Sequence, residues 1–293
     1  MAKLISIPTT PNFIKSNFTL VRTVGTTVSP FTGKTKTQEY DGVFWIAEVS
    51  LPPMERSTAA EWQAFLLELN GATNYFKLAD PSAITNTGTY TTAYLEADKR
   101  VNETSATLSF NNTTSVISGA SSTTYFNTLR VGDFIHITGA TNEDNNGTHK
   151  ITAKSNAYTI TVDNTLVTEA STASCKVRQN IKGSTGLSLL ASTNSATGTI
   201  KKGDYLQVQA AASSTTDPQQ LLLVTEDATV TTDSGKDFIS VKTQPKLRQD
   251  LTDGHYVVFT NPKGRFRLMT NEVDWAANVN QHYGLGFSCI EVV

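Results

Sequence analysis

Short apolar runs separated by turn residues recur along almost the whole chain, and this pattern most constrains the fold. In runs such as Phe134–Thr138 and Tyr158–Val162, apolar and polar residues alternate with the period of a half-buried strand. Threonine accounts for 46 of the 293 residues, and its branched side chain favours strands over helices. Because 38% of the residues are hydrophobic, the chain can bury a core. We therefore expect a mainly β protein of one large domain or two.

One segment, from about Thr58 to Asn70, has the period of a helix instead. Its large apolar residues recur at positions i, i+3, i+4 and i+7 and form one stripe: Trp62, Phe65, Leu66 and Leu69. Thr58 and Glu61 match a capping box, and Gly71 matches the glycine that often follows a helix. We predict one helix whose stripe packs on a sheet. A groove on a partner protein is the alternative.

The segment before this helix predicts a three-stranded meander. Apolar runs at 18–24, 35–40 and 43–51 are typical of strands, and Pro30–Gly33 is typical of a turn.

The composition changes near residue 84 and again near residue 186. Residues 82–128 are rich in Thr, Ser and Asn and carry few charges. Strands at spacings of about 10 residues then continue to Val177, which predicts a small barrel or sandwich. From Gly186 onward the apolar patterning is denser again.

A short pattern occurs twice in the sequence. Gly132–Ile137 and Gly203–Val208 share the order glycine, aspartate, aromatic, aliphatic, polar, aliphatic. Each copy predicts a turn that leads into a strand. Two copies are too few for a solenoid, and a similar local geometry explains the echo at least as well as a duplication.

Charge and hydropathy exclude several classes of protein. The 24 Lys and Arg balance 26 Asp and Glu, so the basic excess of a nucleic-acid binder is missing, and we expect no sequence-specific binding of nucleic acid. No apolar run approaches the roughly 20 residues of a membrane span, so we expect no membrane insertion. The first 13 residues do not resemble a signal peptide, and Cys175 and Cys289 are expected to be buried thiols rather than a disulfide.

The sequence offers no catalytic or metal-binding constellation. Its four histidines, His136, His149, His255 and His282, show no metal-ligand spacing, and no nucleophile-elbow, P-loop or dinucleotide motif occurs. We expect the first two to face solvent or a hydrogen-bond partner. Glu272 and Asp274 lie two apart on an expected strand, where a solvated face is favoured over an acid/base pair. We predict that the protein is not an enzyme and has no catalytic, cofactor-binding or metal site.

One loop partly matches a calcium site. Asn142, Asp144, Asn146 and Gly147 follow the first half of an EF-hand loop, but Ala153 stands where the bidentate glutamate is required. We therefore expect a hairpin loop in which Asn and Gly have positive φ, with weak calcium binding as the alternative.

Several segments at the two ends of the chain occur in a familiar order. Those segments are Pro30–Thr35, Glu39–Ala47, Leu51–Met54, Glu61–Leu66, Asn70–Gly71, Phe76–Pro81, Asn261–Leu268, Asn271–Trp275 and Tyr283–Ser288. Together they resemble the distal tail proteins of long-tailed bacteriophages, over about 18–81 and 200–291. The stretch Gly139–Thr161 is similar to small β modules of phage structural proteins.

The resemblance implies a structural virion protein, located at the phage tail tip and made in the host cytoplasm. In that family a β-barrel with one helix builds a six-fold ring between the tail tube and the hub or fibres, and a smaller β domain projects from the rim. Residues 1–83 and 184–293 would then form a discontinuous ring-forming β-barrel or sandwich domain with the helix. Residues 84–183 would form an inserted small β-barrel domain, OB-like or a sandwich. The implied partners are further copies in a closed hexameric ring, the tail tube protein, and the hub and fibre proteins.

A carbohydrate-binding or receptor-binding β module of a phage tail is the main alternative, since Thr- and Asn-rich β folds often present binding loops. Trp45, Trp62 and Trp275 argue against it because all three lie in patterns expected to be buried. A tail-associated hydrolase would require a catalytic constellation that the sequence does not show.

Overall fold

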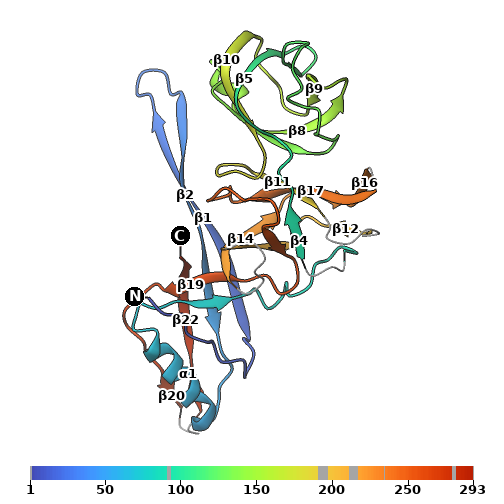
Figure 1. Ribbon diagram of the computed structural model, residues 1–293. Helices are drawn as coiled ribbons and strands as arrows, with labels where there is room; N and C mark the ends of the chain where they lie inside the picture. The colour runs from blue at the N-terminus through green and yellow to red at the C-terminus, as the bar shows by residue number, and fades with distance from the viewer. Residues whose placement is uncertain are drawn as a thin grey trace. The chain divides into compact units, whose positions relative to one another are not determined.

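The computed structural model describes residues 2–90, 94–190, 197–210, 217–233, 235–278 and 282–292. As the sequence predicts, the protein is mainly β, with one α-helix in the described residues. The chain forms two compact units (Figure 1). Unit 1 comprises Met1–Ile84 and Asn261–Val293, and unit 2 comprises Thr85–Thr260.

Unit 1 is built on an antiparallel sheet with the strand order β1-β2-β22-β19-β3. The strands are β1 (Lys15–Val28), β2 (Thr35–Ser50), β22 (Gly286–Glu291), β19 (Gly264–Leu268) and β3 (Phe76–Leu78). A separate pair consists of β20 (Ala276–Ala277) and β21 (Tyr283–Gly284). The two ends of the chain meet in this sheet, because β2 pairs with β22 and β3 with β19.

The helix α1 (Arg56–Glu68) supplies the aromatic core of unit 1. The predicted stripe is buried, and Trp62 is 1% exposed. The Phe65 ring lies 5.4 Å from that of Phe76 on β3, and the Trp62 ring 6.4 Å from that of Phe287 on β22. The predicted capping box is wrong. The helix starts at Arg56, two residues before Thr58, and its N-cap residue Glu55 makes no side-chain cap bond. Gly71 has the expected positive φ, +61°.

Strands β1 and β2 form one long hairpin rather than the predicted three-stranded meander. The expected strands 35–40 and 43–51 are parts of the single strand β2, and the turn at Pro30–Gly33 closes the hairpin. A bulge opposite Thr23 separates the two parts without ending the strand, because the Thr23 hydroxyl donates to the Gly42 carbonyl at 2.9 Å.

Unit 2 contains a closed six-stranded barrel, the first barrel, within residues 102–178. Its strands are β5 (Asn102–Asn111), β6 (Val116–Ser118), β7 (Phe134–Thr138), β8 (Gly147–Lys154), β9 (Thr159–Val162) and β10 (Glu169–Arg178), with the 3₁₀ turn η1 (Glu143–Asn145) between β7 and β8. Inward-facing apolar side chains fill it, among them Leu108, Ile117, Ile135 and Ile160, which are fully buried.

A second barrel in unit 2 closes where β11 pairs with β17. Its strands are β4 (Tyr94–Ala97), β11 (Gly186–Leu190), β13 (Tyr205–Gln209), β14 (Pro218–Val224), β17 (Lys236–Gln244) and β18 (Tyr256–Val258). Strand β16 (Thr231–Asp233) adds to the edge of β17, and β12 (Thr199–Ile200) pairs with β15 (Ala228–Thr229).

The two barrels have the same topology. If the strands of each barrel are lettered a to f along the chain, the neighbour order in both is a-b-e-d-c-f, closed between f and a. The register agrees as well, since Ile137 pairs with Val177 in the first barrel and Val208 pairs with Val257 in the second. The first barrel is inserted between strands a and b of the second, that is, between β4 and β11.

The repeated sequence pattern occupies the equivalent turn of each barrel. Gly132 and Gly203 have φ values of +97° and +95°, a region that glycine enters without strain. Asp133 and Asp204 each accept a hydrogen bond at 2.8 Å from the backbone N–H three residues earlier. The echo is thus part of a repeat of the whole barrel, which favours a duplication over similar local geometry.

The division of the chain differs from the expected one at its second boundary. Residues 184–260 lie in unit 2 and not with the N-terminal segment. The change in composition near residue 186 marks the end of the inserted barrel, whereas the chain returns to unit 1 at Asn261. Strand β4 precedes the inserted barrel in the chain but belongs to the second barrel. The expected insert 84–183 would therefore have separated β4 from the rest of that barrel.

Candidate functional site

The outer half of the β1–β2 hairpin is largely exposed to solvent. Strand β2 pairs with β22 from Ile46 to Ser50, and among the described strands residues 24–28 and 35–39 pair with each other. In Figure 1 this end of the hairpin, in blue, extends beyond the other strands of its sheet. A two-stranded hairpin by itself is only marginally stable in water, and both its edges are open to further pairing.

Four large apolar side chains on this hairpin face solvent. Their exposed fractions are 49% for Val24, 57% for Val28, 94% for Phe31 and 50% for Tyr40. We call residues 22–43 the outer hairpin. The rest of it is Thr-rich and carries charges of both signs, including an ion pair of Arg22 with Glu39 at 3.4 Å. Sequence reasoning identified its turn but not its exposure, which depends on where β22 ends.

Unit 1 also has a cavity of about 440 Å³ over the helix and the C-terminal strands. Its floor is apolar, with Leu66, Leu268 and Phe287, and its rim carries Glu48, Glu272 and Asp274. The prediction of a strand at Glu272 and Asp274 is wrong, since neither residue lies in a described strand. The structure brings both to this rim, and both are largely exposed.

The expectation that all three tryptophans are buried is confirmed for Trp45 and Trp62 and wrong for Trp275. Trp45 is 3% exposed and Trp62 donates its indole N–H to the Thr10 carbonyl at 2.9 Å. Trp275 is 42% exposed. It follows directly on the acidic residues at the cavity rim, in a segment that lies outside the main sheet of unit 1.

The histidines do not form a site. His149 points into the first barrel, is 1% exposed and lies 3.0 Å from the Asn145 carbonyl through Nε2, and burial lowers its pKa. Burial also lowers the pKa of His136 to about 4, and its Nδ1 lies 3.0 Å from the Thr148 hydroxyl. His255 contacts the Gln209 carbonyl through Nε2 at 2.7 Å. All three have hydrogen-bond partners, as expected for the first two.

The loop with the partial calcium pattern is a hairpin connection, but only its glycine has positive φ. Asn142 and Asn146 have φ of −85° and −84°, whereas Gly147 has +124°. The Asn142 side chain accepts from the Asp144 N–H and so starts the turn η1. Within the described ranges no group of three or more His, Cys, Asp or Glu side chains could hold a metal ion.

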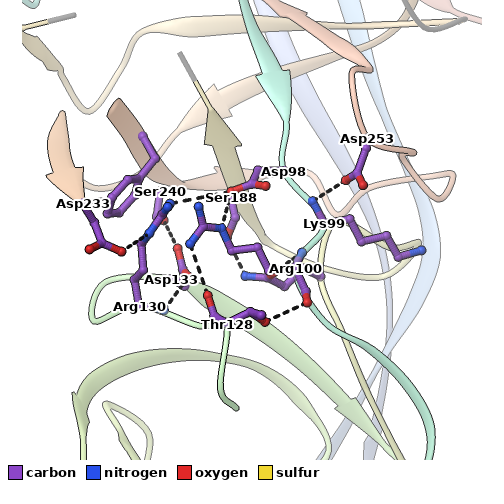
Figure 2. Close-up of polar contacts among 12 residues, drawn as sticks. Asp98, Lys99, Arg100, Thr128, Arg130, Asp133, Ser188, Asp233, Ser240 and Asp253 are labelled. Atoms are coloured by element: carbon purple, nitrogen blue, oxygen red, sulfur yellow. Dashed lines mark hydrogen bonds and ion pairs between the residues drawn. The ribbon is translucent and has the colours of Figure 1, made fainter. Parts of the chain in front are cut away.

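Charged side chains meet between the two barrels of unit 2 (Figure 2). The Arg130 Nε donates to Asp233 at 2.7 Å, and its guanidinium lies 3.8 Å from the Phe238 ring centroid. Arg100 donates to Asp98 through Nε. No sequence pattern indicates this cluster, because its members come from strands and turns of both barrels.

Both cysteines are free and buried, as expected, and burial raises the pKa of each thiol. The helix described here is too short and too polar to span a bilayer. Comparison with protein-family models finds no matching family, and comparison with curated proteins finds no matching sequence.

Proposed function

We propose that this protein is a structural virion protein, a distal tail subunit of a long-tailed phage that assembles into a closed ring. The ring would join the tail tube to the hub or fibres at the tail tip. The observation that carries the proposal is the outer hairpin, which presents open strand edges and solvent-facing Val28 and Phe31.

A second copy of the same chain is the proposed partner of this hairpin. A heterologous contact between identical subunits closes into a ring when its rotation permits, and it then covers every hairpin in the assembly. The near balance of charge, with a formal net charge of −2, limits repulsion between copies. Unit 1, in which both ends of the chain share one sheet, is the proposed ring-forming part. The two barrels of unit 2 are the proposed rim part.

The test is a pair of matched variants. Val28→Ser with Phe31→Ser should abolish ring formation in electron micrographs and native mass spectra while leaving the tryptophan-monitored Tm of unit 1 unchanged. Val131→Ser is the control, since Val131 on the first barrel has the same exposed fraction as Val28, 57%, but lies outside the hairpin. We expect Val131→Ser to assemble like the wild type.

The decisive measurement is a reconstruction of the particle that contains this chain, because rings of this kind can require a tail-tube template to close. Several symmetry-related copies around the tail axis would support the proposal. A single asymmetric copy would contradict it.

The exposure of Trp275 favours a second candidate function, a carbohydrate-binding or receptor-binding module. An exposed indole face beside carboxylates can stack on a sugar ring while the carboxylates accept from its hydroxyls. Trp275→Ala should then abolish binding in a glycan array. Leu67→Ala, at a 61% exposed position on α1, is the control. Absence of glycan binding by the wild type contradicts this candidate.

A further inference from the structure

Asp133 is a buried carboxyl group at the joint between the two barrels. Its side chain is 1% exposed. One oxygen accepts from the backbone N–H of Arg130 at 2.8 Å, and the other accepts from the hydroxyl of Ser240 on β17 at 3.2 Å. The second bond crosses from the first barrel to the second, as Figure 2 shows.

The equivalent carboxyl of the repeated turn, Asp204, has more donors. One of its oxygens accepts from the backbone N–H of Lys201 at 2.8 Å, as in the first barrel. The other accepts from both the N–H and the hydroxyl of Thr87, at 2.7 and 2.8 Å. The same turn therefore gives one aspartate three donors and the other only two, of which one is a neutral hydroxyl on the other barrel. A buried carboxylate is harder to stabilise with fewer donors.

Charged groups of both signs surround Asp133. They are Asp98, Arg100, Arg130, Lys154 and Asp233. Both arginines are already paired, Arg100 with Asp98 and Arg130 with Asp233. Burial raises the pKa of Asp133 to about 7, although Arg100 and the Ser240 hydroxyl oppose the shift.

We propose that the joint between the two barrels is a pH-sensitive contact that Asp133 controls. The neutral carboxyl group fits the buried joint between the turn before β7 and Ser240 on β17, and ionisation places an under-solvated charge between the barrels. Because the pKa of Asp133 in the folded protein lies above the ordinary 3.8, its extra stabilisation is complete below about pH 4 and is lost as the pH rises through 7. His136 and His149, whose pKa values are lowered, act in the opposite direction below about pH 6.5. A comparison of variants is therefore required.

Hydrogen exchange of the full chain is the appropriate measurement, since all three tryptophans lie in unit 1 and do not report on the joint. After correction for intrinsic exchange, we expect wild-type protection in 134–138 and 236–244 to fall about tenfold from pH 6 to pH 8, the change that one group titrating near 7 supplies. Asp133→Asn stays neutral and keeps an acceptor for the Arg130 N–H, so its protection should not change with pH. Peptides of unit 1 are the internal reference.

Asp204→Asn is the matched control in the other copy of the turn, and it should retain the wild-type pH dependence of the joint. If Asp133→Asn does not fold, Ser240→Ala supplies the test. Removal of that donor should move the loss of protection to higher pH. Equal pH dependence in wild type and Asp133→Asn, or no pH dependence of the wild-type joint, would overturn the proposal.

Discussion

At the scale of single residues, Glu169 ties the loop after β7 to strand β10. Its carboxylate accepts from the backbone N–H groups of Thr141 at 2.8 Å and Asn142 at 3.1 Å, from the Asn145 amide at 2.9 Å, and from the Thr172 hydroxyl. Desolvation alone would raise the pKa of Glu169, but the four hydrogen bonds have the larger effect and lower the pKa to about 2. The loop that resembles half of a calcium site is thus organised by a carboxylate of the protein itself.

Glu169→Gln should lower the free energy of unfolding of the first barrel by about 1–3 kcal/mol, since it leaves donors without a charged acceptor. The contribution of Glu169 is complete above its ordinary pKa of 4.5 and is lost as the pH falls through about 2. The measurement is hydrogen exchange of β8 and β10 between pH 3 and pH 7. Glu143→Gln, on the same loop, is the control that removes an equal charge. Similar effects of both variants would contradict this account.

Trp62→Ala should cost about 3–5 kcal/mol, because it removes a large, fully buried ring from the unit 1 core. We expect loss of folded protein rather than a selective binding defect. Leu67→Ala on the same helix, where the side chain is 61% exposed, should change stability by no more than about 0.5 kcal/mol. Thermal unfolding followed by circular dichroism compares the two. An unchanged melting temperature for Trp62→Ala would mean that the ring is not part of the core.

At the scale of elements, the start of α1 is under-stabilised. Glu55 occupies the N-cap without a side-chain cap bond, so Glu55→Ser should add about 0.5–1 kcal/mol of stability. Thr58→Ala distinguishes the two accounts of this helix end. It should cost about 1 kcal/mol if Thr58 caps the helix and nothing if it lies inside the first turn, as in the structure. Equilibrium urea unfolding followed by tryptophan fluorescence measures both.

At the scale of the whole molecule, the nested barrels predict which deletions the chain tolerates. Ala97 pairs with Leu189, and the Asp98 N–H donates to the Ser188 carbonyl, so β4 and β11 would form a hairpin if the first barrel were absent. A chain without residues 100–186, in which an Asn-Gly turn joins Lys99 to Leu187, should keep the second barrel folded.

Removal of 84–183 is the contrasting deletion, because it takes β4 out of the second barrel. We expect this chain to lose protection in 205–209 and 236–244, while the deletion of 100–186 retains it. Residues 99–183 alone should give a cooperative β-type unfolding transition. If both deletions unfold the second barrel, the two barrels share one core and are not separate copies.

Local sequence patterns predict many of the elements of this architecture. The alternation in Phe134–Thr138, the apolar stripe around Trp62 and the two Gly-Asp turns predicted a strand, a helix and two turns that lead into strands. The structure contains all of them, because each depends on a period or a backbone conformation within a few residues. Local cues failed at the edges of elements. They predicted two strands where β2 is one strand with a bulge, and they placed the start of α1 two residues too late.

Only the tertiary structure decided how the strands combine. The four-residue β4 lies beside β18, where Leu95 pairs with Val257, and the buried Asp133 bonds to Ser240, 107 residues away. It also placed the exposed Trp275 and the outer hairpin, since exposure depends on which neighbouring strand ends first. Such pairings form when the packing energy of the whole chain exceeds the entropic cost of closing long loops. A short stretch of sequence contains information on neither quantity.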